Sequence, residues 1–311
     1  MKLKKSVLSL LLAFIIALSL LSPAFAKEVI FNPDAYATII TASDFQDVGV
    51  KAYDRFEKII SNMKKEGLDD PDSVLIGGDY SLVLPDYATQ GVHLIKEKYT
   101  SVYPNENENS IVFIQGNHDW LSNAFTKTGF HDMGSYCIYV LNEDDFTWKQ
   151  TKNTSPDKIK SIADDLSKNL DNMISSDDNR PVFVLTHVPL HYTVRADGKD
   201  NLYASYIFDV LNEKANQLDI VFLFGHNHSS EVDNYIGGSV NFFKPGDKIN
   251  IPDPENKSTV TFSEKTLNFT YLNYGYVGYS NNANSDGSVN TLTVGTIELS
   301  EETISFIKFS E

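Results

Sequence analysis

The sequence contains a single cysteine, Cys137, among its 311 residues. One cysteine excludes an intramolecular disulfide and every zinc site that needs several thiolates. Its position far from the N-terminus also excludes a lipid-anchored cysteine at a signal cleavage site. Cys137 lies in the apolar stretch GSYCIYVLN, so we expect an inert core residue there.

Positive charge is also scarce, with 26 Lys and Arg residues against 42 Asp and Glu residues and a formal net charge of −16. This acidity argues against a nucleic-acid backbone or an anionic membrane surface as a steady partner. An anionic substrate would need positive charge at its binding site, and bound cations could supply it.

Long apolar runs are missing except at the beginning of the chain. Three lysines precede a 15-residue apolar stretch, 7–21, and Ala24-Phe25-Ala26 follows it. This is the pattern of a secretory signal peptide, and the stretch is shorter than the roughly 20 residues of a spanning helix. We expect cleavage after Ala26 and a secreted or extracytoplasmic protein without a transmembrane segment. Cleavage removes three lysines and no acidic residues with residues 1–26, so the net charge of the mature chain should be −19.

No internal repeat or low-complexity linker divides the remaining residues, so we expect one domain over 27–311. Apolar residues at helical spacing predict helices over 53–67, 87–103, 155–176 and 201–217. Alternating β patterns follow from about residue 235, best seen at 258–279 and 290–310. Alternation of strands and helices with a β-rich tail predicts an α/β fold. We expect a four-layer α-β-β-α sandwich of two packed mixed sheets with helices outside, in which the tail completes the second sheet.

Five short apolar runs end in small residues followed by a side chain that can bind a metal. The runs lie at 37–46, 73–80, 111–119, 181–191 and 219–224, and the side chains are Asp44, Asp79, Asn117, His118 and Asp119, His187, and His226 with His228. Runs of this kind predict strands buried on both faces, and ligands bind beyond the carboxyl ends of such strands. We therefore expect a metal site at the C-terminal edge of the strands, with all five runs in one sheet.

Aspartate, asparagine and histidine without cysteine form a mixed oxygen and nitrogen ligand set. Such a set favours divalent Mn, Fe or Zn. The side chains are too many for one tetrahedral ion, whereas two ions about 3.5–4 Å apart with a shared carboxylate would use them all.

The ordered motifs resemble those of the calcineurin-like metallophosphoesterase family over about residues 37 to 230. The motifs are Asp44-x-Gln46, Gly78-Asp79, Gly116-Asn117-His118-Asp119, His187 and Gly225-His226-Asn227-His228. The resemblance implies that Asp79 bridges two cations, that Asp44, Gln46 and His228 hold the first, and that Asn117, His187 and His226 hold the second. It also implies that Asn117 and His118 contact the substrate, that metal-bound hydroxide attacks the phosphoester, and that His118 hydrogen-bonds a phosphoryl oxygen or protonates the leaving group.

Residue 46 departs from the family pattern, which has Asp-x-His where this chain has Asp-x-Gln. A glutamine oxygen is a poorer donor than imidazole to borderline ions, so the first cation should bind more weakly or be a harder ion such as Mn²⁺ or Mg²⁺. We expect an exported phosphoesterase. The main alternative is a catalytically degenerate cell-surface binding protein that retains the fold; a metallopeptidase or amidase is less favoured.

Other candidate residues near the motifs carry weaker signals. His191 could reach the site or lie in a solvated loop, while His93 and His131 are expected to have no role. The aromatic residues Phe45, Tyr80, Trp120 and Tyr192 are expected to pack in the core or at the rim rather than against a substrate ring. No segment carries a motif for a particular phosphoester.

Overall fold

The computed structural model describes most of the chain after residue 30. The described residues are 31–46, 51–80, 87–105, 110–120, 123–146, 156–191, 202–228, 242–253, 261–278, 293–301 and 303–310. The chain divides into two units, Met1–Asn32 and Pro33–Glu311, and every element described below belongs to the second. The predicted signal peptide, 1–26, lies outside the described residues and stays a prediction. Within the described part, no helix combines the length and the apolar character needed to cross a bilayer.

The first sheet contains strands from both ends of the second unit. Its order is β12 (Gly275–Tyr276), β13 (Thr293–Leu299), β1 (Ala37–Ala42), β2 (Ser73–Ile76) and β3 (Ile111–Phe113), and β14 (Ile304–Ser310) pairs with β13. Strands β1, β2 and β3 are parallel and end level with one another, because Ala42 pairs with Ile76 and Ile76 pairs with Phe113. The loops that follow these three strands therefore leave the sheet at one edge.

The second sheet has the order β4 (Gly129–Asp132), β5 (Cys137–Leu141), β6 (Val182–Thr186), β7 (Ile220–Phe224), β11 (Thr270–Asn273) and β8 (Phe242–Phe243). Its four central strands are parallel, and β4 and β8 are antiparallel edge strands. A separate two-stranded ribbon consists of β9 (Lys248–Asp253) and β10 (Thr261–Thr266), and β9 contacts α6.

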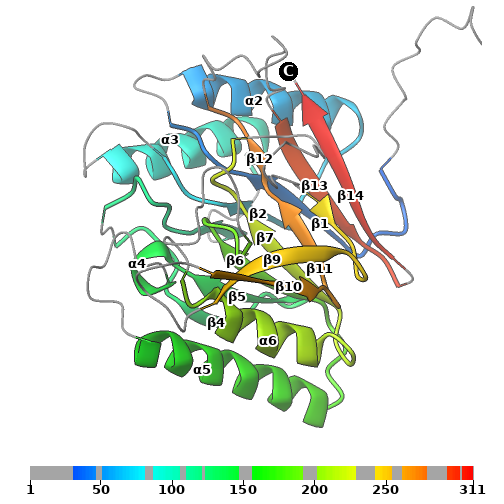
Figure 1. The fold of residues 1–311 in the computed structure, drawn as a ribbon. Helices are drawn as coiled ribbons and strands as arrows, with labels where there is room; N and C mark the ends of the chain where they lie inside the picture. The colour runs from blue at the N-terminus through cyan, green and yellow to red at the C-terminus, as the bar shows by residue number, and fades with distance from the viewer. Residues whose placement is uncertain are drawn as a thin grey trace, which may run out of the picture. The chain divides into compact units, whose positions relative to one another are not determined.

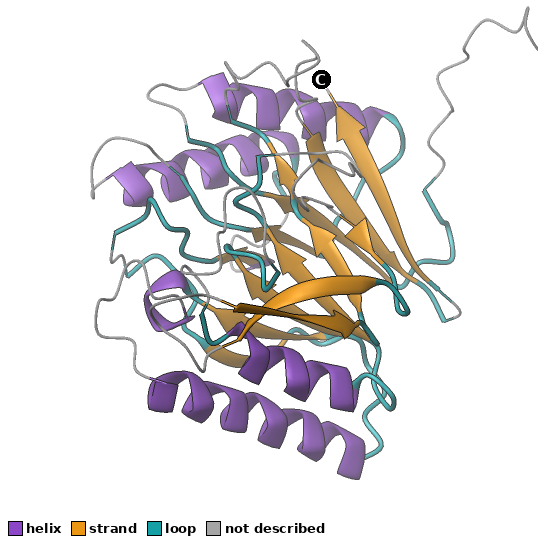
Figure 2. Ribbon diagram, in the orientation of Figure 1, coloured by secondary structure: helices purple, strands orange, loops and turns teal. Residues whose placement is uncertain are grey.

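Helices cover the outer faces of the two sheets (Figures 1 and 2). They are α2 (Lys51–Lys65), α3 (Tyr87–Val102), α4 (Glu143–Phe146), α5 (Pro156–Ser175) and α6 (Ala204–Lys214). Helices α2 and α3 pack together on the side of the first sheet, and α5 and α6 pack together on the side of the second.

Strand β5 shows why the fold has four layers, since successive side chains of a strand point to opposite faces. Ile138 and Val140 belong to the apolar cluster that joins the two sheets. Cys137, Tyr139 and Leu141 belong to the cluster that includes α5 and α6. The expected α-β-β-α sandwich and all four predicted helices are confirmed, and Cys137 is a fully buried core residue.

Two expectations about the sheets differ from the structure. The five runs with site residues were expected in one sheet, but β1, β2 and β3 belong to the first sheet and β6 and β7 to the second. The tail was expected to complete the second sheet; β8 and β11 join that sheet, and β12, β13 and β14 also join the first. A strand buried on both faces has the same apolar pattern in either sheet, so the pattern cannot assign it.

Candidate metal centre

The site residues follow the carboxyl ends of five strands and are held there by backbone hydrogen bonds that continue the sheets. In the first sheet, the nitrogens of Asp44 and Gln46 donate to the carbonyls of Gly78 and Asp79, both at 3.0 Å. In the second sheet, the nitrogen of Gly225 donates to the carbonyl of His187 at 2.8 Å. The loops therefore have defined positions at the same edge of the sandwich.

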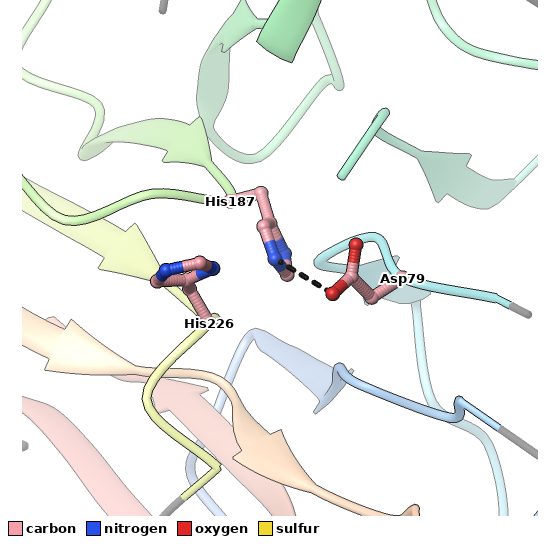
Figure 3. Close-up of side chains that lie close together, drawn as sticks. All are labelled: Asp79, His187 and His226. Carbon is pink, nitrogen blue, oxygen red and sulfur yellow. Dashed lines mark ion pairs between the residues drawn. The ribbon is translucent and has the colours of Figure 1, made fainter. Parts of the chain in front are cut away.

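One group of side chains gathers around Asp79, His187 and His226 (Figure 3). The Nε2 atom of His187 lies 3.2 Å from Oδ2 of Asp79 and 3.0 Å from Oδ1 of Asn117. That same Asn117 oxygen is 2.9 Å from Nδ1 of His226. The other ring nitrogen of His187 is 2.7 Å from the carbonyl of Gly77, which orients Nε2 toward the group.

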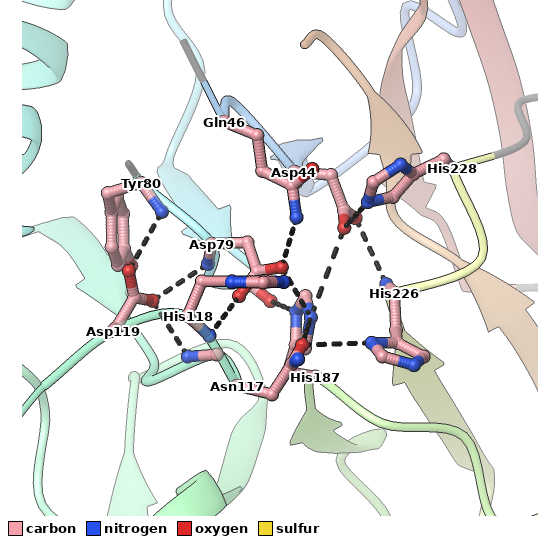
Figure 4. Close-up of polar contacts among 12 residues, drawn as sticks. Asp44, Gln46, Asp79, Tyr80, Asn117, His118, Asp119, His187, His226 and His228 are labelled. Carbon is pink, nitrogen blue, oxygen red and sulfur yellow. Dashed lines mark hydrogen bonds and ion pairs between the residues drawn. The ribbon is translucent and has the colours of Figure 1, made fainter. Parts of the chain in front are cut away.

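A second group contains Asp44, Asp79 and His228, so Asp79 belongs to both groups (Figure 4). Nε2 of His228 lies 3.2 Å from Oδ1 of Asp44. The Nε2 atom of Gln46 donates to Oδ2 of Asp79 at 2.5 Å. In each group the candidate ligand atoms lie within 4.8 Å of one another.

The backbone at these residues is strained. Asp44, Gln46, Asp79, His226 and His228 all have positive φ angles, between 34° and 68°. Among the described residues, Asp177 is the one further residue other than glycine with a positive φ. Side chains make this region unfavourable, and such strain concentrates at functional sites because the surrounding structure must hold it.

The carboxylates and the central imidazole are buried, and their charges depend on one another. Asp44, Asp79 and His187 are each 0% exposed. Burial alone would raise the pKa of Asp79, but the nearby His187 ring lowers it well below its ordinary value. Burial would lower the pKa of His187, whereas Asp79 and Asp44 raise it to about 10. The anionic form of Asp79 is therefore favoured beside a positive charge.

The donor set fits divalent cations. The two groups offer carboxylate, amide and imidazole atoms and no thiolate, as borderline divalent ions prefer. Oδ1 of Asp44 is buried and accepts no well-formed hydrogen bond, although Nε2 of His228 lies 3.2 Å away. A buried carboxylate oxygen without such a donor is costly, and a cation would stabilise it. A cation held by Asp79 and His187 would bind His187 in its neutral form. The cation, in place of the protonated imidazole, would then supply the positive charge beside Asp79.

A model of the calcineurin-like phosphoesterase family matches residues 37–230, which is more than half of the chain. The chain belongs to the calcineurin-like phosphoesterase family. No curated protein sequence matches the chain significantly.

The solved structures to which this chain is similar are distant from it in sequence. A dimetal phosphatase from Danio rerio superimposes with a TM-score of 0.54 at 9% identity and covers 89% of this chain and 97% of its own. An uncharacterized predicted phosphoesterase from Streptococcus pneumoniae matches with a TM-score of 0.33 at 12% identity, over 88% of this chain and 89% of its own. At this identity the similarity to the Danio rerio protein establishes the fold alone.

The Gly-Asn-His-Asp motif of the family forms a tight loop, and its last residue, which the sequence offered as a side chain that can bind a metal, instead accepts hydrogen bonds from the backbone. Asp119 is 3% exposed, and its carboxyl accepts the backbone N–H groups of Asp79, Tyr80 and Gly116 at 2.7, 2.9 and 2.8 Å. Burial and the charge of Asp79 raise the pKa of Asp119 to about 8. Asp119 thus ties the loop after β3 to the loop that carries Asp79.

The same two loops meet at a pair of glycines. Gly78 has a φ of 94°, and a Cβ atom on it would lie 2.6 Å from the backbone nitrogen of Gly116. A Cβ on Gly116 would overlap both the backbone and the carboxylate of Asp79. Glycine at both positions therefore permits the close approach of the loops.

His118 lies in this loop with an exposed side chain. Its backbone nitrogen donates to Oδ1 of Asp79 at 2.9 Å (Figure 4). The loop thus places an exposed imidazole beside the two ligand groups.

Aromatic residues from later strands hold two of the site loops, which no local sequence signal indicated. Tyr276 of β12 stacks on the ring of His228, with centroids 5.0 Å apart. His191 was expected in a solvated loop or in the site, but it is buried, and Nδ1 lies 2.9 Å from the hydroxyl of Tyr271. That hydroxyl also accepts the backbone N–H of Leu190 at 2.6 Å.

The remaining aromatic and histidine candidates differ in how far their side chains are exposed. Phe45 and Tyr80 are core residues at 0% exposure, whereas Trp120 is 65% exposed. His93 is exposed on α3, Nε2 of His131 lies 2.7 Å from the carbonyl of Lys127, and Tyr192 lies outside the described residues.

Proposed function

We propose that the chain is an exported phosphoesterase that hydrolyses phosphomonoester or phosphodiester bonds with two divalent cations. The observation that carries this proposal is that one buried carboxylate, Asp79, belongs to both ligand groups. A shared carboxylate suits a two-metal centre, whose ions lie about 3.5–4 Å apart. Membership of the calcineurin-like phosphoesterase family supports phosphorus as the reaction centre.

The side chains divide between the two cations in a defined way. Asp44, Asp79 and His228 would hold the first with Gln46 beside them, and Asp79, Asn117, His187 and His226 would hold the second. Mn, Fe or Zn suits these ligands. When bound, the two cations offset the charge that develops on the phosphoryl group and lower the pKa of a water molecule.

The chain itself supplies substrate contact and proton transfer. Asn117 and His118 are neighbours on one loop, and the hydrogen bond from the His118 nitrogen to Asp79 fixes that loop relative to both ligand groups. The exposed His118 ring can meet the substrate and give a proton to the oxygen of the leaving group. A general acid of this kind contributes about 10²–10⁴-fold to the rate.

Hydrolysis of mono- and bis-(p-nitrophenyl) phosphate by the purified protein with added Mn²⁺ tests the proposal. We expect turnover that EDTA abolishes and Mn²⁺ restores. Asp79→Ala should lose both activity and metal, whereas His118→Ala should lose about 10²–10⁴-fold in kcat and keep its metal content. Metal-independent turnover, or none on a broad panel of phosphoesters, would refute the proposal.

The alternative, a binding protein that retains the fold, is motivated by Gln46. The metal content of the purified protein distinguishes this alternative from the enzyme. Elemental analysis of the purified protein should find two equivalents of transition metal for the enzyme. No metal, or one equivalent that Gln46→His does not raise, would favour a binding protein that has lost hydrolysis.

Export rests on the lysine-rich start, the apolar stretch and the Ala24-Phe25-Ala26 end. Residues 1–35 fused to a reporter enzyme that is active only after export should produce activity, and N-terminal sequencing of the exported product should begin at Lys27. Reporter protein that stays inside the cell would contradict export.

A further inference from the structure

Trp120 directly follows the Gly-Asn-His-Asp motif and is exposed, whereas Phe45 and Tyr80, the other described aromatic residues next to the motifs, are buried. Its side chain is 65% exposed, while Phe45 and Tyr80 are 0% exposed. Among the described residues, Tyr36 and Phe262 are the other large exposed hydrophobic residues, at 44% and 39%. Tyr36 precedes β1, at the opposite end of that strand from Asp44.

The backbone that leads into Trp120 is held firmly. The Asp119 nitrogen donates to the carbonyl of Gly116 at 3.1 Å, and Nε2 of Gln115 donates to the carbonyl of Asp119 at 3.1 Å. That carbonyl belongs to the same planar peptide as the nitrogen of Trp120. Three further hydrogen bonds hold the Asp119 carboxyl. The backbone on the N-terminal side of Trp120 is therefore fixed.

The position of Trp120 relates it to the leaving group. It is two residues from His118, so the two Cα atoms are at most about 7 Å apart. His118 is the residue that would face the oxygen of the leaving group. The exposed indole of Trp120 therefore belongs to the same loop as the residue that would meet the leaving group.

We propose that Trp120 is the binding surface for a flat aromatic group in the esterified part of the substrate, either an aryl ring or a nucleobase. This inference rests on the proposed phosphoesterase function. An exposed indole that follows a fixed stretch of backbone loses little conformational freedom when a ring stacks on it. Stacking of a base on an aromatic side chain changes affinity by about 5- to 100-fold.

Phosphonates test this role without hydrolysis, because their carbon–phosphorus bond is not an ester. Phenylphosphonate and cyclohexylphosphonate are similar in size, but only the first is flat and aromatic. The methylenephosphonate analogues of adenosine 5′-monophosphate and ribose 5-phosphate, in which carbon replaces the ester oxygen, form a second pair, which tests a nucleobase. Calorimetric titration of the Mn²⁺-loaded protein gives all four dissociation constants. Fluorescence offers a second measurement of binding. The chain has two tryptophans, so Trp120 is the remaining tryptophan in the Trp148→Phe variant, and its emission reports a ligand that contacts it.

We expect the wild-type protein to bind phenylphosphonate about 5- to 100-fold more tightly than cyclohexylphosphonate. Trp120→Ala should remove this difference, and Trp120→Phe should keep most of it. Tyr36→Ala, which removes an exposed aromatic at the far end of β1, should behave as wild type. Preference for the adenosine compound as well would assign the surface to nucleobases, whereas preference for the phenyl compound alone would assign it to aryl groups.

Equal affinities within both pairs, equal losses for aromatic and saturated ligands in Trp120→Ala, or no binding of any phosphonate would overturn the inference. Hydrolysis of p-nitrophenyl phosphate separates these results from failure of the proposed function. Turnover without an aromatic preference would overturn only the role of Trp120. Aromatic preference in binding without turnover of any phosphoester would overturn only the proposed hydrolysis.

Discussion

Replacement of Gln46 by alanine should weaken one cation site and leave the other nearly unchanged. Gln46 lies on the side of Asp79 that faces Asp44 and His228, and its amide is 2.5 Å from Oδ2 of Asp79. The structure has the amide nitrogen toward Asp79, and a half-turn of the amide would direct Oε1 to a cation between the carboxylates. In the other group, His187 and His226 both contact Oδ1 of Asn117.

The expected size of the effect follows from the two roles that Gln46 can have. If Gln46 is a neutral ligand, its loss should weaken the binding of the first cation by about 10- to 100-fold, or about 1.4–2.8 kcal/mol. As a hydrogen-bond donor only, it competes with the cation for Asp79, and a hydrogen bond to a charged group contributes about 1.5–3 kcal/mol. Its removal would then tighten the first site. The sign of the change therefore distinguishes the two roles.

Calorimetric titration of metal-free protein with Mn²⁺ should resolve two transitions. Gln46→Ala should shift the weaker one, and His228→Ala should shift the same transition further because it removes an imidazole ligand. His226→Ala, a matched change of the neighbouring histidine, should shift the other transition. Gln46→His should tighten the first site and change its preference toward Zn²⁺ or Fe.

Two outcomes would refute the assignment of Gln46 as a ligand. One is a Gln46→Ala protein in which both transitions keep their positions. The other is a first transition that moves to lower Mn²⁺ concentration. A shift of both transitions by equal factors would instead mean that the substitution acts through Asp79, which the two sites share.

Three further predictions concern the loops and the core. Asp119→Ala leaves three backbone N–H groups without their acceptor, so urea unfolding should show a free energy of unfolding lower by about 3–5 kcal/mol. A decrease below about 1 kcal/mol would contradict the anchoring role of Asp119. Gly116→Ala should abolish metal binding in a protein that still folds by circular dichroism, because its Cβ would overlap Asp79, and unchanged metal content would exclude the tight approach of the loops. Burial raises the pKa of the Cys137 thiol to about 11, so a thiol reagent at pH 8 should react only when the protein unfolds. The folded state therefore holds the Cys137 proton to a higher pH than the unfolded state does. The free energy of unfolding should consequently fall as the pH rises from about 9 to about 11.

The helices were predictable from local sequence alone. The stretch 155–176 predicted the helix found at Pro156–Ser175, and its buried residues include Ile159 and Leu166 of the expected apolar stripe. An amphipathic helix carries its own periodicity, so its position does not depend on the rest of the chain. The ordered motifs at the strand ends likewise indicated which side chains the structure brings together around Asp79.

The distribution of the strands was not predictable in the same way. The runs ending at Asp79 and His187 look alike in sequence, yet β2 and β6 belong to different sheets. Both strands are buried on both faces, so their apolar patterns carry no information about their neighbours. The site consequently spans two sheets where we had expected one.

The sequence by itself determined the helices, the class of fold and the side chains available for metal binding, because each depends on the chemistry or spacing of nearby residues. Only the tertiary structure decided that Asp119 anchors three backbone groups, that Tyr276 stacks on His228, and that Trp120 is exposed while Tyr80 is buried. These properties depend on contacts between segments far apart in the chain. Burial and hydrogen bonding of a side chain are decided by whichever segments the fold brings next to it, and local sequence does not contain that information.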